Sequence, residues 1–153
     1  MSPDSQEDTA GIERAAVEMR QLIEKELVSY PHLTEKNVIL GGFSLGGATA
    51  LYTALSHQGT YGGLIALSTW LPMRNKFMED KTLFSRQKVG ELQIFQGHGD
   101  SDPVVPFQFG KLTSQIISQA GLDSKFKSYA GMAHSSCEEE MKDMKKFIEK
   151  FLK

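Results

Sequence analysis

The sequence has one cysteine, no long apolar run and no stretch of concentrated basic residues. Cys137 alone cannot close a disulfide within the chain, which is typical of a reducing compartment. No apolar stretch approaches the roughly 20 residues needed to span a bilayer. The N-terminus is acidic and polar, whereas a secretory signal peptide has basic and then apolar residues. These absences predict a cytoplasmic protein.

The charge balance argues against one class of partner. The 17 basic and 19 acidic side chains give a net charge of −2, and lysine and arginine nowhere gather beside aromatic residues. A nucleic-acid-binding surface is therefore not expected. With 153 residues, 40% of them apolar and 24% charged, the chain has the size and composition of one globular domain. No linker or repeat divides it, so we expect a single domain over residues 1–153.

Apolar patterning predicts helices and strands that alternate along the chain. The expected strands are four short runs at residues 37–40, 64–67, 92–95 and 125–129. The expected helices are an amphipathic one from about 12 to 27, one after Ser44, one over 106–120 and one from about 137, with a loop and a short helix within 73–88. This alternation implies an α/β fold with a mostly parallel sheet covered by helices on both faces. Ligands of such sheets bind at the carboxyl ends of the strands.

One pentapeptide indicates the chemistry. Gly42-Phe43-Ser44-Leu45-Gly46 directly follows the first strand, and Gly-x-Ser-x-Gly at a strand-to-helix turn is typical of the nucleophile elbow of serine hydrolases. We expect both flanking glycines to be required, because strand and helix cross too closely for side chains. The following helix N-terminus then favours negative charge on a substrate oxygen. The alternative is a glycine-rich turn with an ordinary serine.

Two further residues complete a catalytic constellation. A serine nucleophile needs a base to take its proton, and the base needs an acid to orient it. In this fold the expected order along the chain is serine, then an acid, then histidine. Ser44, Asp102 and His134 follow the first, third and fourth strands in that order. We therefore predict Ser44 as nucleophile, Asp102 as acid and His134 as base.

Structural roles are expected for the other polar residues nearby. Asp100 is expected to bond backbone amides of its own loop, the usual role of aspartate in turns. His98 is expected to form hydrogen bonds within the same loop, and His32 and His57 to be exposed to solvent.

Other interpretations stay open at this point. A metal site would use four residues that lack compact ligand spacing: His98, Asp100, Asp102 and His134. Cys137, three residues after His134, suggests a Cys–His pair, but its place on the apolar face of the last helix favours a buried, inert thiol. Trp70 either lines an acyl-chain pocket or is a core or rim aromatic.

Four segments together resemble the acyl-protein thioesterase/lysophospholipase family of α/β hydrolases. They are residues 41–48, 67–72, 97–106 and 131–137, and residues 2–8 also resemble the family's segment before its helix. The resemblance implies an α/β-hydrolase fold, Ser44, Asp102 and His134 as the triad, the Leu45 N–H as an oxyanion donor, and no cofactor.

The same resemblance implies a palmitoyl-protein hydrolase. Such enzymes cleave thioesters that link palmitate to protein cysteines, and they release fatty acid from lysophospholipids. The implied partners are therefore S-acylated proteins or lysophospholipids, with transient contact at a membrane surface and a substrate-binding role for Trp70. Leu45 stands where members often have glutamine, which is expected to alter substrate contacts but not the backbone donor.

The main departure from the family is at the N-terminus. Family members begin with strands that precede Ser2, and one of their loops carries a His-Gly-Leu-Gly-Asp motif that supplies a second oxyanion donor; this sequence contains no such motif. We therefore expect an N-terminally truncated domain with half an oxyanion hole, and loss of one donor typically slows such enzymes about a hundred- to a thousand-fold. The elbow strand would form an apolar edge, which predicts low stability or self-association. Two alternatives remain: a catalytically impaired fragment that acts only in binding, and a carboxylesterase on small esters.

Overall fold

The computed structural model describes residues 7–80, 82–85 and 89–152. Its helices are α1 (Thr9–Ser29), α2 (Leu45–Ser56), α3 (Arg74–Glu79), α4 (Thr82–Ser85), α5 (Phe107–Gln119) and α6 (Glu138–Glu149), with a 3-10 turn η1 (Glu35–Asn37). Its strands are β1 (Ile39–Phe43), β2 (Gly63–Leu67), β3 (Gln93–Gly99) and β4 (Asp123–Tyr129). The predicted alternation of helices and strands is confirmed, although residues 81 and 86–88 of the predicted loop lie outside the described residues.

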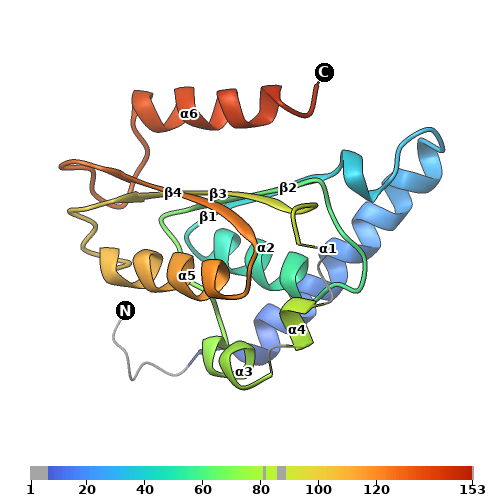
Figure 1. The fold of residues 1–153 in the computed structure, drawn as a ribbon, viewed down its shortest axis with the longest axis horizontal. Coiled ribbons are helices and arrows are strands. Elements are labelled where there is room, and N and C mark those ends of the chain that lie inside the picture. Colours follow the sequence, from blue (N-terminus) through green and yellow to red (C-terminus); the bar gives the residue numbers. More distant parts are fainter. Residues whose placement is uncertain (1–6, 81, 86–88, 153) are drawn as a thin grey trace.

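The four strands form one parallel sheet in the order β1-β2-β3-β4. Helix α6 covers one face of the sheet, and α1, α2 and α5 lie on the other face (Figure 1). Because every strand runs the same way, the loops that leave their carboxyl ends meet at one edge of the sheet. The predicted α/β fold with a doubly covered parallel sheet is confirmed. None of the described helices is long and apolar enough to cross a membrane.

Strand β2 shows how the two layers share the sheet. All five of its residues are buried, which is typical of a central parallel strand. Leu64 and Ala66 belong to the large apolar cluster on the α1 and α2 side. Ile65 and Leu67 pack in a second cluster with Phe147 of α6. Strand β2 therefore uses alternate residues to hold the helices of opposite faces.

Strand β3 is longer than its apolar run predicts. It continues through Gly97 and Gly99, so that His98, expected in a loop, belongs to the strand. A Cβ on Gly97 would lie 2.4 Å from Glu140 Oε1, and a Cβ on Gly99 would lie 2.0 Å from the Met132 carbonyl oxygen. Glycine, a weak strand former, is used here because the helix and the loop approach the strand closely.

Candidate active site

Ser44 lies at a strained turn between β1 and α2. Its backbone has φ 55° and ψ −124°, a conformation that few residues other than glycine adopt. Three hydrogen bonds hold the turn: the Ser44 N–H donates to Leu67 O at 2.9 Å, and Ser44 O accepts from the Ala48 N–H at 3.0 Å and from Thr69 Oγ1 at 2.7 Å. Neighbouring segments thus keep in place a conformation that would be costly in isolation.

Only one of the two glycines that flank the elbow is sterically required. A Cβ on Gly42 would lie 2.2 Å from the Gly46 carbonyl carbon, whereas a Cβ on Gly46 would meet no atom of the described part of the chain within 4 Å. The second constrained position is Gly47, whose Cβ would lie 2.8 Å from Gly42 O and 2.9 Å from Thr69 Cβ. The expectation that both motif glycines are needed was therefore wrong for Gly46, because the helix turns Gly47, not Gly46, toward the strand.

Asp102 is the best-satisfied carboxylate at this edge of the sheet. Its Oδ2 accepts a hydrogen bond from His134 Nδ1 at 2.8 Å, and its Oδ1 accepts from the backbone N–H groups of Val104 at 2.8 Å and Val105 at 2.9 Å. Its side chain is fully buried. Burial on its own would raise the pKa of Asp102, but the hydrogen bonds from His134, Val105 and Val104 outweigh it and hold the pKa below its usual value. Asp102 therefore remains ionised beside the imidazole.

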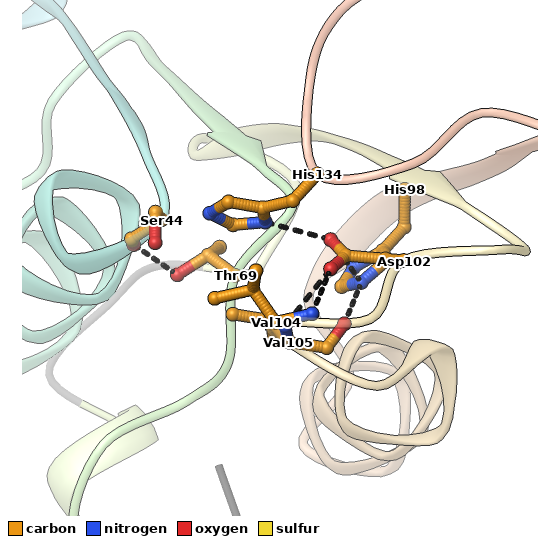
Figure 2. A network of polar contacts seen from close by, with 7 residues as sticks. All are labelled: Ser44, Thr69, His98, Asp102, Val104, Val105 and His134. Atoms are coloured by element: carbon orange, nitrogen blue, oxygen red, sulfur yellow. Dashed lines mark hydrogen bonds and ion pairs between the residues drawn. The ribbon is translucent and has the colours of Figure 1, made fainter.

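The His134 ring lies between Asp102 and Ser44 (Figure 2). Because Nδ1 donates to Asp102, the neutral ring keeps Nε2 as an acceptor on its opposite side, toward Ser44. Phe43 packs against this ring, with the ring centroids 4.6 Å apart and the planes inclined by 44°. The structure thus brings the three predicted residues together and adds Phe43, which sequence reasoning missed; its position directly before the serine was the only signal.

The Leu45 amide begins helix α2 directly after Ser44. The first N–H groups of a helix have no carbonyl partner within that helix, and the Leu45 N–H is one of them. The positive end of the helix dipole lies at the same point. The Leu45 side chain is 57% exposed and does not cover the turn.

His98 and Asp100 connect the surrounding segments. His98 Nε2 donates to Val105 O at 2.9 Å, and burial lowers the pKa of this ring, so it stays neutral. Asp100 Oδ1 accepts from the Gly131 N–H at 2.7 Å as well as from Ser101 Oγ at 2.9 Å. The prediction that Asp100 bonds amides of its own loop was therefore wrong: it joins the loop that carries Asp102 to the loop that carries His134.

Trp70 is buried behind the elbow. Its side chain packs with Ala48, Val105 and Phe109, and only 8% of the residue is exposed. Its indole Nε1–H donates to Glu7 Oε1 at 2.9 Å. Of the two roles left open for Trp70, this environment favours the core aromatic.

Two of the minor predictions need correction. Cys137 is the half-buried N-cap of α6, where its Sγ accepts from the Glu140 N–H at 3.5 Å, so it is not part of the buried apolar stripe. His57 is not simply exposed, because its Nε2 lies 2.7 Å from Glu35 Oε1 and its ring stacks on Tyr61. His32 is exposed as predicted. Across residues 7–80, 82–85 and 89–152, no group of three or more His, Cys, Asp or Glu side chains is placed to hold a metal ion.

A serine at a strained strand-to-helix turn, with a histidine held by a buried carboxylate, is the arrangement of serine hydrolases built on a parallel α/β sheet. The family comparison agrees with this class. Residues 1–152 match the phospholipase/carboxylesterase family, and the chain belongs to that family.

Individual relatives point in the same direction. The chain is 37% identical to acyl-protein thioesterase 1 of Mycosarcoma maydis, over 95% of this chain and 63% of that protein. It is 38% identical to acyl-protein thioesterase 1 of Neurospora crassa, over 93% of this chain and 56% of that protein. The chain therefore spans about three fifths of the length of these relatives.

Solved structures share the fold. SOBER1 of Arabidopsis thaliana superposes with a TM-score of 0.83 at 28% identity, over all of this chain and 70% of that chain. Acyl-protein thioesterase 2 of Zea mays superposes with a TM-score of 0.77 at 27% identity, over all of this chain and 70% of that chain.

Proposed function

We propose that this chain is a single domain carrying the acyl-transfer machinery of a serine hydrolase that acts on fatty-acyl thioesters of protein cysteines and on lysophospholipid esters. One observation carries the proposal: His134 is bonded to the buried Asp102 through Nδ1 and presents its other nitrogen toward Ser44 at the elbow. The substrate class is supported by the relatives named acyl-protein thioesterase.

The geometry suggests the order of steps. His134 Nε2 takes the proton of Ser44 Oγ, which attacks the carbonyl carbon of the thioester or ester. The Leu45 N–H donates to the oxygen that becomes negative. The sulfur or oxygen leaving group departs with the proton from His134, and an acyl-serine remains. Water then gives a proton to His134 and attacks the acyl carbon, the bond from that carbon to Ser44 Oγ breaks, and His134 returns the proton to Oγ as the fatty acid is released.

Asp102 and Phe43 serve the base in this mechanism. The Asp102 carboxylate fixes the tautomer in which Nε2 can accept a proton, and it stabilises the imidazolium that then forms. The Phe43 ring, packed on the imidazole, limits its rotation away from Ser44. No step requires a cofactor.

Active-site labelling tests the assignment. Ser44→Ala should abolish covalent labelling by a fluorophosphonate probe, because the acceptor oxygen is gone. Ser118→Ala, which changes an exposed serine on α5, should label like the wild type. Labelling that survives Ser44→Ala would contradict the assignment. If Ser118→Ala lost labelling to the same extent as Ser44→Ala, the loss would report on folding and not on the removal of the nucleophile.

Substrate preference is tested by comparing two leaving groups. We expect hydrolysis of an S-palmitoylated peptide with kcat/KM above that for a short-chain p-nitrophenyl ester. Both reactions use the same residues, so only the ranking of kcat/KM separates them. The reverse ranking would favour the carboxylesterase alternative. Binding of the acylated peptide without turnover, together with absent probe labelling, would favour a protein that acts only in binding.

We also propose that copies of this chain associate through the β1 edge. Among the described residues, β1 pairs with β2 only, which leaves the hydrogen-bonding groups of its other side available. Beside it, a groove of about 480 Å³ between α1 and β1 is lined mainly by apolar side chains, and Leu22 in its wall is 59% exposed. Sedimentation at increasing protein concentration should reveal oligomers that Leu22→Lys weakens. A monomer at all concentrations would overturn this proposal.

A further inference from the structure

Two donors of the turn that follows β2 share one carboxylate, that of Glu7, while the Leu71 N–H of the same turn donates to Thr113 Oγ1 at 2.7 Å. Glu7 Oε1 accepts from Trp70 Nε1 at 2.9 Å, and Glu7 Oε2 accepts from the Met73 N–H at 2.9 Å. The two donors lie 63 and 66 residues further along the chain than the acceptor. Glu7 is half-buried and directly precedes Asp8, the N-cap of α1. The segment before α1 is thereby joined to the turn beside the elbow.

This turn contacts the segments that carry both Ser44 and Asp102. Thr69 Oγ1 donates to the Ser44 carbonyl at 2.7 Å, so the turn fixes the elbow backbone. The adjacent Trp70 packs with Val105, whose N–H donates to Asp102 Oδ1 at 2.9 Å. A displacement of Trp70 would therefore reach the nucleophile through Thr69 and the acid through Val105.

The turn depends on an external acceptor. Met73 has φ 50°, a left-handed conformation that is unfavourable for a residue with a side chain, and it is the N-cap of the short helix α3. Trp70 has a buried indole whose only polar atom is a donor. An ionised carboxylate satisfies two donors at once and makes stronger hydrogen bonds than a neutral group. Without it, two donors at the turn would lose their partner.

We propose that Glu7 is a positioning residue that sets the place of Trp70 and, through Thr69, the geometry of the Ser44 elbow. This inference rests on the proposed acyl transfer at Ser44. Glu7 itself touches no reacting atom, so its removal should lower the rate of the chemical step more than it weakens substrate binding. Displacements of about 1 Å at a nucleophile cost up to about a hundredfold in rate.

Trp70 is the only tryptophan of the chain, so tryptophan fluorescence reports on the surroundings of this one side chain. Glu7→Ala should move its emission to longer wavelength and increase quenching by acrylamide. The same variant should lower kcat on a p-nitrophenyl ester and the rate of fluorophosphonate labelling by about ten- to a hundredfold, with KM changed less than threefold. Glu7→Gln keeps one acceptor oxygen and should fall between Glu7→Ala and the wild type. The matched control Glu18→Gln removes an exposed charge on α1 and should change neither signal.

The outcomes separate this inference from the proposed function. A shifted emission with an unchanged labelling rate would show that Glu7 is only structural, and an unchanged emission would show that the contact is absent; either result overturns the inference. If the wild type itself is not labelled, the proposed function fails, while the emission still tests the contact. If Glu7→Ala does not fold, Trp70→Phe takes its place, because it removes one of the two donors to Glu7. Trp70→Phe should lower kcat, and Glu7→Gln should then lower kcat less in the Trp70→Phe variant than in the wild type. Additive losses of kcat would overturn the inference.

Discussion

Two buried carboxyl groups, Asp102 at the carboxyl edge of the sheet and Glu140 on α6, have opposite environments. Asp102 receives three hydrogen bonds, and its pKa lies below the usual value. Glu140, on α6, is fully buried, and neither of its oxygens has a hydrogen-bond partner among the described residues. Burial raises the pKa of Glu140 from 4.5 to about 7. The comparison shows that burial alone does not decide the charge of a carboxyl group; the donors placed around it do.

The two groups also make the stability of the folded state depend on pH in opposite directions. Asp102 has a lowered pKa in the folded state, so it contributes stability above its unfolded pKa, and this contribution is lost as the pH falls through the acid range. Glu140 has a raised pKa, so the folded state keeps a proton that the unfolded chain has already lost. Its contribution therefore falls as the pH rises from 4.5 toward 7.

The largest expected effect comes from neutralising the satisfied carboxylate. Asp102→Asn should lower kcat/KM on a p-nitrophenyl ester by about 10⁴-fold, because the asparagine amide favours the tautomer of His134 in which Nε2 carries the proton. The melting temperature, followed by circular dichroism, should show that the variant is folded. Asp100→Asn is the matched control, since its amide oxygen can still accept from the Gly131 N–H, and it should cost less than tenfold. A loss below tenfold for Asp102→Asn would contradict the role of Asp102.

Neutralising the unsatisfied carboxyl group of Glu140 should raise the free energy of unfolding above pH 7. The contribution of Glu140 to the free energy of unfolding should fall by roughly 3 kcal/mol between pH 4.5 and 7 because its pKa is raised, whereas the lowered pKa of His98 acts in the opposite direction below pH 6.5. Glu140→Gln should remove most of this slope, so that the variant equals the wild type at pH 5 and exceeds it at pH 8. Urea unfolding at four pH values measures both slopes.

The neighbouring Glu139 provides the control for this experiment. Its side chain is 67% exposed and pairs with Lys127, so Glu139→Gln should leave the pH dependence nearly unchanged. Parallel curves for the wild type and Glu140→Gln would show that another group controls the pH dependence.

A smaller effect is expected from the glycine beneath Glu140. Gly97→Ala places a methyl group 2.4 Å from Glu140 Oε1, so the side chain must move within a closed space, at a cost of about 1–3 kcal/mol. Gly46→Ala, with no atom of the described residues within 4 Å and a helical position in α2, should be neutral or stabilising by up to about 1 kcal/mol. The melting temperatures of both variants, compared with that of the wild type, measure the difference. Equal losses would mean that the space around Gly97 is not closed.

Local sequence patterns predict most of the fold. Apolar runs locate all four strands, and the 3–4 spacing on α1 locates that helix, because both signals depend on which face of an element is buried. The order Ser44, Asp102, His134 predicts which side chains meet, since the carboxyl ends of parallel strands lie at one edge. The pattern fails at the end of β3, where glycines that are weak strand formers are required by the approach of α6 and of the loop at Met132.

Three roles that sequence patterns misassigned or missed depend on contacts between distant segments. Asp100 bonds Gly131, Glu35 pairs with His57, and Glu7 reaches Trp70. No periodicity or motif encodes such pairs, because each depends on how the loops and helices pack after the sheet has formed.

Short segments of the sequence are sufficient to predict the α/β alternation and the three residues that meet at the carboxyl edge, because local propensity and strand direction are properties of such segments. How each of those residues is supported depends on the folded chain. Asp102 and Glu140 differ by only one methylene group, and nothing local distinguishes a carboxyl group that receives three donors from one that receives none among the described residues. Their charges depend on where the neighbouring N–H groups lie, and those positions exist only in the folded chain.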